Sequence, residues 1–334
     1  MTGANDRASV WCIVQSDGDR SHLSPLNHLD VRHVPIQYCC IGERITLLQQ
    51  TMQRALRITA PPRVVVTLAA GHRAYWAGPL WSVPAHRRVI DESTGRHTIS
   101  LAVASTLIEK ADSQALAVLM PADAFCANDW ALHSGIQAAL QALERLPRHL
   151  LALALEPPQH GEPQDYLVRG DFDGFPGRAV ARCVRRPSTP IGRRLAAAGA
   201  CINSGVYITR IKTLTEMLEN HWPAMLDGVR RILKASTNDF IIPARFDGAE
   251  FQRPWRHTWL QRPVTHLRAL PVPNTGWSSL TSVAALERLL IDCPEFARLP
   301  QGRSPELPSR YAELAQSHSY HRLIPRGDGE TLCP

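Results

Sequence analysis

The sequence has little lysine, no closely spaced cysteine pairs of the C-x-x-C kind and no long apolar run. Lysine occurs only at positions 110, 212 and 234, whereas arginine is frequent along the whole chain. No stretch approaches the roughly 18 to 20 uninterrupted apolar residues that a membrane-spanning helix requires. Asp6 and Arg7 precede the first apolar stretch, so the N-terminus lacks the pattern of a secretory signal. These absences predict a cytoplasmic protein without a membrane span.

The charge and the cysteines exclude further classes of protein. The chain of 334 residues carries a net charge of +7. Its basic residues are scattered, without the aromatic-interleaved patches or zinc-finger spacing of nucleic-acid-binding modules. We therefore expect a phosphate-bearing small ligand and no nucleic acid. The eight cysteines contain no C-x-x-C pair, which in a long cytosolic chain predicts reduced and mostly buried thiols.

Apolar strands alternate with amphipathic helices in the first half of the chain. Apolar or β-branched runs predict strands at 10–15, 63–68, 115–120 and 150–155. Helical periodicity predicts helices at 46–58, 99–108 and 132–146. Thr98 stands where it can cap the second of these helices. This alternation is typical of an α/β fold with a mostly parallel sheet flanked by helices.

The second half of the chain is less regular. Residues 161–177 are rich in Gly, Pro and Asp, which predicts a loop or hairpin, and 202–205 predict a polar turn that leads into a strand. Further elements are expected as a strand at 179–184 and helices at 192–198, 211–219 and 281–291. We predict one domain over residues 1–291 and a C-terminal tail over 292–334 that packs loosely or binds a partner.

An aspartate follows the apolar run at 115–120. Ligands of open α/β sheets bind beyond the carboxyl ends of the strands, and Asp123 stands at that end. A carboxylate there can hold a divalent cation against nucleotide phosphates, so Asp123 is the candidate metal ligand. The alternative is an ordinary aspartate at the start of a loop.

Six short motifs follow one another along the chain. They are Gly42 to Gln49, Arg63 to Arg73, Glu92 to Thr98, Met120 to Asp123, Ile202 to Gly205 and Gly276 to Leu280. In this order and at this spacing they resemble the motifs of the mannose-1-phosphate guanylyltransferases, which belong to the sugar nucleotidyltransferase superfamily. The resemblance implies a single Rossmann-like nucleotidyltransferase domain. It also implies nucleotide or sugar contacts at the positions that keep the pattern, namely Gly18, Glu92, Gly95, Arg96, Thr98, Asn203 and Gly205.

Several charge-bearing positions depart from the pattern of that family. In the loop at 17–26, which matches the family's glycine-rich phosphate cradle, His22 stands for the arginine. Ile36 stands for the lysine of the P-K-Q-F motif, and Arg185 stands for the glutamate of E-K-P, which should receive sugar hydroxyls. Ser279 stands for a second metal-binding aspartate. The glycines of the family's T-G-Y-G-Y loop are also missing from Glu162-Pro163-Gln164-Asp165-Tyr166.

These departures affect one kind of chemistry. Nucleotidyl transfer depends on positioning and charge neutralisation, and each lost electrostatic donor typically costs on the order of 10²–10³ in rate. We therefore expect a degenerate, catalytically impaired guanylyltransferase that binds a nucleotide or nucleotide sugar, or that regulates or scaffolds a partner protein or a homo-oligomer. With Asp123 as the single metal carboxylate, Mg²⁺ is a doubtful cofactor.

Two alternatives remain. One is an active mannose-1-phosphate guanylyltransferase that uses Arg20, Arg185 and Arg186 in place of the lost cations. The other is a glycosyltransferase or binding protein with Asp123 as a ligand of a nucleotide-sugar metal. Such a metal site usually has a D-x-D pair, a spacing that occurs at 171–173.

The motif at 92–98 generates a test. Arg96 can donate to an anion near the start of a helix, where negative charge is favoured. The alternative is a turn that only joins a strand to the helix at 99–108. If that contact exists, Arg96→Ala should weaken nucleotide binding in a titration and leave the melting temperature nearly unchanged. No binding of any nucleotide or nucleotide sugar at millimolar concentration would contradict the assignment.

Overall fold

A computed structural model describes most of the chain. It describes residues 9–18, 35–39, 45–77, 80, 83–92, 97–157, 164–235, 240–244, 266–280 and 289. In this part of the chain no helix combines the length and the hydropathy needed to cross a membrane. The predicted helix at 281–291 and the predicted tail at 292–334 lie outside the described residues except for Leu289, so both stay predictions.

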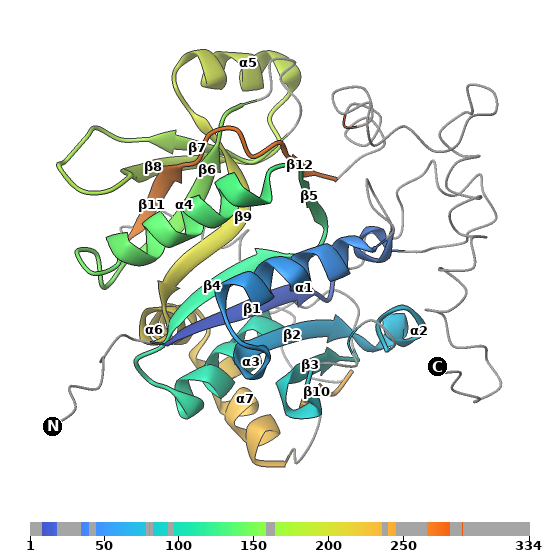
Figure 1. Ribbon diagram of the computed structural model, residues 1–334. Helices are drawn as coiled ribbons and strands as arrows, with labels where there is room; N and C mark the ends of the chain where they lie inside the picture. The colour runs from blue at the N-terminus through green and yellow to red at the C-terminus, as the bar shows by residue number, and fades with distance from the viewer. Residues whose placement is uncertain are drawn as a thin grey trace, which may run out of the picture.

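A ten-stranded mixed sheet forms the centre of the fold (Figure 1). In spatial order its strands are β10 (Phe240–Ile242), β3 (Arg88–Asp91), β2 (Val64–Ala69), β1 (Val10–Ser16), β4 (Leu116–Pro121), β9 (Cys201–Arg210), β6 (Leu150–Leu155), β11 (Leu267–Pro271), β8 (Arg178–Val184) and β7 (Tyr166–Arg169). The five strands from β10 to β4 are all parallel to one another. Among the ten, β9 and β8 run against the rest. The predicted α/β fold with a mostly parallel sheet is therefore confirmed, and β4 lies near the middle of the sheet.

Helices cover both faces of the sheet. Strand side chains alternate between the faces, so Cys12 and Val14 join one apolar cluster while Trp11 and Ile13 join the other. The first cluster includes α1 (Leu47–Ile58) and α4 (Asp129–Ala142). The second includes α3 (His97–Ala111), α6 (Ile211–His221) and α7 (Pro223–Ala235). Because both faces are buried, the strands read as nearly continuous apolar runs.

The five strands β9, β6, β11, β8 and β7 form a closed ring, because β7 also pairs with β9. β7 pairs with β8 at one edge and also with the start of β9, through Tyr166 opposite Ile202. The helix α5 (Thr189–Ala197) packs over this region at Gly192, where a Cβ would come within 3.0 Å of the Tyr166 hydroxyl. A separate two-stranded sheet joins β5 (Ala124–Cys126) to β12 (Trp277–Ser279).

Short helices complete the described part of the chain. They are α2 (Arg73–Trp76) and the 3₁₀ helices η2 (Ile36–Tyr38), η3 (Pro61–Arg63), η4 (Ala70–His72) and η5 (Ala85–Arg87).

The predicted strands at 10–15, 63–68, 115–120 and 150–155 match β1, β2, β4 and β6 to within a residue at each end. Two helix starts were placed too late. The helix α3 begins at His97, so Thr98 lies inside its first turn and is not its cap. The helix α4 begins at Asp129 because the Asn128 side chain caps it by accepting from the main-chain N–H of Ala131.

Thr46 caps α1 as part of a capping box. Its Oγ1 accepts from the Gln49 main-chain N–H at 3.2 Å, and the Gln49 Oε1 accepts from the Thr46 N–H at 2.9 Å. Thr46→Ala should therefore lower the free energy of unfolding by about 1 kcal/mol in a urea titration. Ser188 is the matched control, because it precedes α5 without any side-chain capping bond. Ser188→Ala should change the free energy by less than about 0.5 kcal/mol; equal losses in both variants would contradict the role of the cap.

Candidate functional site

A polar pocket lies beyond the carboxyl end of β4. Its cavity volume is about 50 Å³, small against the roughly 300–1,000 Å³ typical of sites that enclose a small ligand. The residues that line it lie at the end of β4 and the start of β5 (Pro121, Asp123 and Ala124), in β9 (Asn203, Ser204 and Gly205), in β12 (Ser279), and just before β7 and after β8 (Gln164, Asp165 and Arg186). Four residues singled out in the sequence thus meet in one pocket: Asp123, Asn203, Gly205 and Ser279.

Asp123 and Ser279 share one wall of this pocket. Asp123 follows β4 by two residues and precedes β5. Ser279 pairs with Ala124, the residue after Asp123, across the ladder between β12 and β5, and both Asp123 and Ser279 line the pocket. Mg²⁺ usually takes one or two carboxylates together with substrate phosphates, and this wall offers one carboxylate, Asp123, with a serine where the resemblance implies a second. Among the described residues no three His, Cys, Asp or Glu side chains gather in a way that could hold a metal ion.

The motif at 202–205 is a bulge inside β9 and not the expected turn. Between Ala152 and Ala154 the pairing with β6 shifts, so residues 204–206 of β9 stand opposite the single Leu153. Gly205 has a φ of +79°, which a residue with a side chain rarely adopts. The Ser204 Oγ donates to the Leu153 carbonyl oxygen at 2.7 Å and satisfies an acceptor that the bulge removes from the ladder.

The side chain of Asn203 is committed to this bulge. Its Nδ2 donates to the buried hydroxyl of Tyr207 at 2.6 Å, and its Oδ1 accepts from the main-chain N–H of Gly205 at 3.1 Å. Its own main-chain N–H donates to the carbonyl oxygen of Asp165 at 2.8 Å. Asn203 therefore shapes the pocket, with one amide hydrogen still available to a ligand.

Arg186 lines the pocket in an unusual backbone conformation. Its φ is +35°, in the left-handed region that costs free energy for a residue with a Cβ. Its main-chain N–H donates to the Asp165 Oδ1 at 3.3 Å, which helps to hold the turn. Arg185, the departure noted in the sequence, is exposed and is not one of the described residues that line the pocket.

The segment after β1 and the nearby helix η2 present acidic, amide and apolar side chains and no cation at the described positions Asp17, Ile36 and Gln37. Asp17 is 1% exposed, and its Oδ1 accepts from the Thr67 hydroxyl of β2 at 2.7 Å. The Gln37 Nε2 donates to the Gly18 carbonyl oxygen at 2.7 Å. Ile36 is fully buried and packs in the apolar core. A buried carboxylate and an isoleucine thus stand where the resemblance implies a phosphate cradle and a lysine.

The other predicted contacts are only partly described. Glu92 is exposed, and its main-chain N–H donates to the Ile242 carbonyl oxygen at 3.1 Å. Thr98 is fully buried, so its hydroxyl does not face solvent. Gly95, Arg96 and His22 lie outside the described residues, as does Arg20, and their assignments stay predictions.

The D-x-D spacing at 171–173 is occupied by an ion pair. Arg268 is 4% exposed, and its Nη1 and Nη2 donate to the two carboxylate oxygens of Asp173 at 2.8 and 2.6 Å. These hydrogen bonds from Arg268 hold the pKa of Asp173 well below its usual range. Asp173 therefore fastens its loop to β11, which argues against a metal role for this pair.

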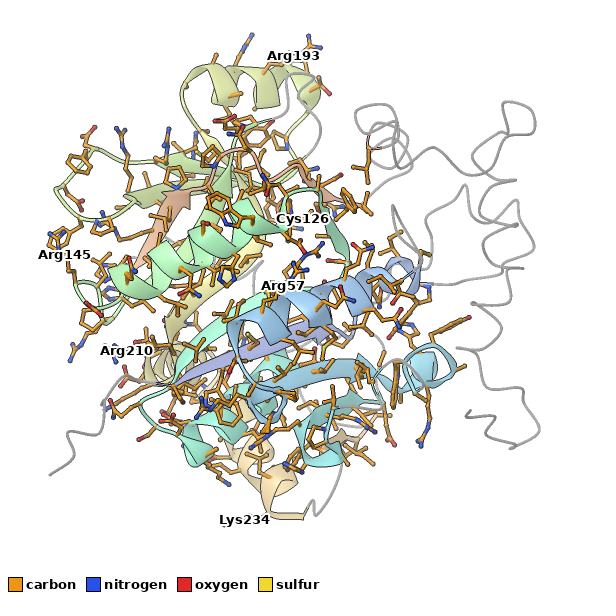
Figure 2. All side chains as sticks on the ribbon, viewed as in Figure 1. Arg57, Cys126, Arg145, Arg193, Arg210 and Lys234 are labelled. Atoms are coloured by element: carbon orange, nitrogen blue, oxygen red, sulfur yellow. The ribbon has the colours of Figure 1, made fainter. Side chains whose placement is uncertain are left out.

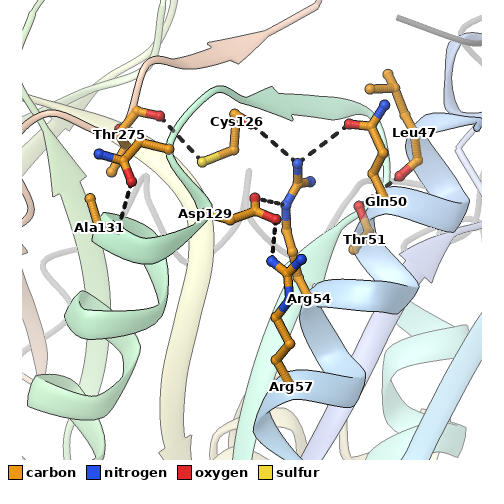
Figure 3. A network of polar contacts seen from close by, with 10 residues as sticks. Leu47, Gln50, Thr51, Arg54, Arg57, Cys126, Asp129, Ala131 and Thr275 are labelled. Atoms are coloured by element: carbon orange, nitrogen blue, oxygen red, sulfur yellow. Dashed lines mark hydrogen bonds and ion pairs between the residues drawn. The ribbon is translucent and has the colours of Figure 1, made fainter. Parts of the chain in front are cut away.

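An ion-pair network that the sequence did not reveal holds β5 against α1 (Figure 3). The Asp129 carboxylate accepts from the Arg54 Nε and the Arg57 Nη1, both at 2.6 Å. Arg54 also donates to the Cys126 carbonyl oxygen at 3.4 Å, and the Cys126 thiol donates to the Thr275 carbonyl oxygen at 3.3 Å. Because Arg54 and Asp129 are 75 residues apart, only the folded chain brings them together. The network therefore holds the two-stranded sheet of β5 and β12, which carries Ser279, against α1.

The cysteines that the structure describes are free thiols. Cys12, Cys39, Cys126 and Cys201 are buried and Cys183 is half-buried, in agreement with the expectation of mostly buried thiols. Burial raises the pKa of Cys126 to about 11, so this thiol is protonated at neutral pH and is a weak nucleophile.

No protein-family model matches the chain. A mannose-1-phosphate guanylyltransferase, ManC, of Salmonella typhimurium is 23% identical over 304 residues, which cover 86% of this chain and 61% of that protein. The alginate biosynthesis protein AlgA of Pseudomonas aeruginosa is 24% identical over 246 residues, covering 72% of this chain and 50% of AlgA. The chain thus spans about half to three-fifths of the length of these relatives.

Solved structures share the fold. A protein of Thermus thermophilus described as a mannose-1-phosphate geranyltransferase superposes with a TM-score of 0.66 at 18% identity, over 84% of this chain and 79% of that one. A protein of Helicobacter pylori described as a mannose-6-phosphate isomerase gives a TM-score of 0.61 at 13% identity, over 81% and 99%. These likenesses show the fold, and the resemblance drawn from the motifs is confirmed by the similarity to ManC and AlgA.

The burial of Ile36 generates a test. Ile36→Lys should lower the free energy of unfolding by about 3 kcal/mol or more, because an unpaired charge would enter the core. Ile36→Leu, a volume-conserving control, should cost less than about 1.5 kcal/mol. Ser279→Asp, at a half-buried pocket position, should be tolerated. A stable Ile36→Lys variant in a urea titration would show that this position can still present a cation to the loop after β1.

Proposed function

We propose, from the premise that the chain belongs with the mannose-1-phosphate guanylyltransferases of the sugar nucleotidyltransferase superfamily, that it binds a nucleotide or nucleotide sugar and turns over GTP and mannose 1-phosphate poorly. In this proposal it acts as a binding or regulatory relative of the active enzymes, alone, as a homo-oligomer or with a partner protein.

The state of the chain after β1 carries the proposal. A triphosphate needs donors and cations that are fixed before it binds. Here the carboxylate of Asp17 is buried at the strand end, and Ile36 packs into the core without any cation to offer. The side-chain amide of Gln37 already donates to the Gly18 carbonyl oxygen. These changes act on the same phosphates, so even strongly non-additive losses leave little of a normal rate.

The pocket beyond β4 supports retained binding. It keeps one carboxylate from the predicted metal site, Asp123, together with the bulge of β9. Its walls are mainly polar, which suits the hydroxyls and phosphates of a nucleotide sugar better than an apolar ligand. With Ser279 in place of the second metal-binding aspartate that the resemblance implies, binding should depend little on Mg²⁺.

Arg186 supports the second candidate, an active guanylyltransferase with substitute cations. It lines the pocket beside Asp165 and is a guanidinium that could neutralise phosphate charge there. Arg193 makes a matched control, because it projects from the outer surface of α5 (Figure 2).

A pyrophosphate-release assay separates the two candidates. Given GTP, mannose 1-phosphate and Mg²⁺, the purified chain should release pyrophosphate at a trace rate, with a mannose-1-phosphate guanylyltransferase as the positive control. Robust release that disappears in Asp123→Ala and in Arg186→Gln, but persists in Arg193→Gln, would establish the active alternative.

Calorimetric titration tests the retained binding. GDP or GDP-mannose should bind to the same protein with little dependence on Mg²⁺. Asp123→Ala should therefore weaken the binding of these ligands only slightly, whereas removal of an essential metal ligand would weaken it strongly. Failure of every nucleotide and nucleotide sugar to bind at millimolar concentration would reject the pocket as a ligand site.

A further inference from the structure

Asp165 stands at the seam where β7 meets β9. It is half-buried, lines the pocket and directly precedes β7. Its carbonyl oxygen accepts from the Asn203 main-chain N–H at 2.8 Å. The next residue, Tyr166, pairs with Ile202 of β9. The main chain of Asp165 is therefore fixed on both sides of the pocket wall, so the position of its carboxylate is set by the sheet.

The carboxylate of Asp165 is aimed by the turn at Arg186. Its Oδ1 accepts from the Arg186 main-chain N–H at 3.3 Å. A carboxylate has about four lone-pair sites, so this single bond leaves most of its accepting capacity to a ligand. The positive φ of Arg186 shows that the turn is held in a conformation that local preference does not favour.

Other polar side chains at this wall are already engaged within the protein. The Asn203 amide bonds Tyr207 and Gly205, and the Ser204 hydroxyl donates to Leu153 while accepting from the Val206 N–H. Among the described lining residues near β7 and β9, Asp165 is thus the ionised acceptor with spare capacity.

We infer that Asp165 is a specificity-determining residue that accepts hydrogen bonds from hydroxyl groups of the sugar part of a bound nucleotide sugar. This inference rests on the proposed function. An ionised carboxylate only accepts, so it favours neutral hydroxyl donors and repels an anionic sugar. Asp123, a second carboxylate in the same pocket, adds to that repulsion. The ligand class is a nucleotide joined to a neutral sugar with free hydroxyls.

A purely structural role for Asp165 predicts different behaviour. If the carboxylate served only to hold the turn, Asp165→Asn would have little effect, because the amide oxygen can still accept from the Arg186 N–H. A role in sugar binding requires the charge, since hydrogen bonds to charged groups are about twice as strong as neutral ones. Asp165→Ala removes both the charge and the acceptor and serves as the variant that releases the turn.

Calorimetric titrations with GDP and GDP-mannose test the inference. The sugar contact predicts that Asp165→Asn binds GDP-mannose about tenfold more weakly, while its affinity for GDP stays within about twofold. Asp171→Asn is the matched control, because it removes an exposed carboxylate from the following loop, outside the pocket lining. It should leave both affinities unchanged. Asp165→Ala should weaken both ligands, since Arg186 loses its fixed position.

Three outcomes would overturn the inference. If Asp165→Asn binds GDP-mannose as tightly as the natural chain does, the carboxylate does not read the sugar, although the proposed nucleotide binding stands. If it weakens GDP and GDP-mannose equally, Asp165 acts on the nucleotide or on the pocket as a whole. If the natural chain binds neither compound, the inference and the proposed binding function fail together. An unchanged melting temperature in Asp165→Asn verifies that each comparison concerns a folded protein.

Discussion

The pairing of β4 with β1 on one side and β9 on the other is the interaction on which the rest of the structure depends. β4 is parallel to β1 but antiparallel to β9. The carboxyl end of β4 therefore points toward the amino-terminal half of β9, and Asp123 meets the bulge around Asn203 in one pocket. A parallel β9 would present its opposite end at this edge. The site thus follows from the direction of a single strand at the centre of the sheet.

The sequence predicted this centre well and its edges poorly. β1, β2, β4 and β6 are short apolar runs that are buried on both faces, and such runs are visible without the fold. β3, β10 and β11 escaped notice because each has five residues or fewer and two of them contain arginine. They are strands because a neighbouring strand offers them a free edge, which is tertiary information that local periodicity does not contain.

The same division holds for the site. Asp123, Asn203, Gly205 and Ser279 could be selected from the sequence because they belong to motifs whose family places them near a ligand, and the pocket brings them together. Asp165 was noted only as part of a stretch that lacks the family's glycines, because its place at the pocket depends on the pairing of β7 with β9, which are distant in the sequence. The bulge in β9 was misread as a turn because Asn-Ser-Gly is a typical turn sequence. Only the resumption of pairing with β6 on both sides distinguishes the two.

The chain after β1 shows how packing can replace charge. An isoleucine at position 36 contributes to the core through burial, worth roughly 1.5–3 kcal/mol for a fully buried side chain. A lysine there would have to leave the core or remain desolvated. The pocket beyond β4 is under no such constraint, since its polar side chains are held by the bulge, by the seam of β7 and β9 and by the ribbon of β5 and β12. Under the proposed function, an impaired phosphate cradle and a retained pocket are compatible, because Ile36 contributes to the core while the pocket is built from hydrogen bonds that the sheet needs in any case.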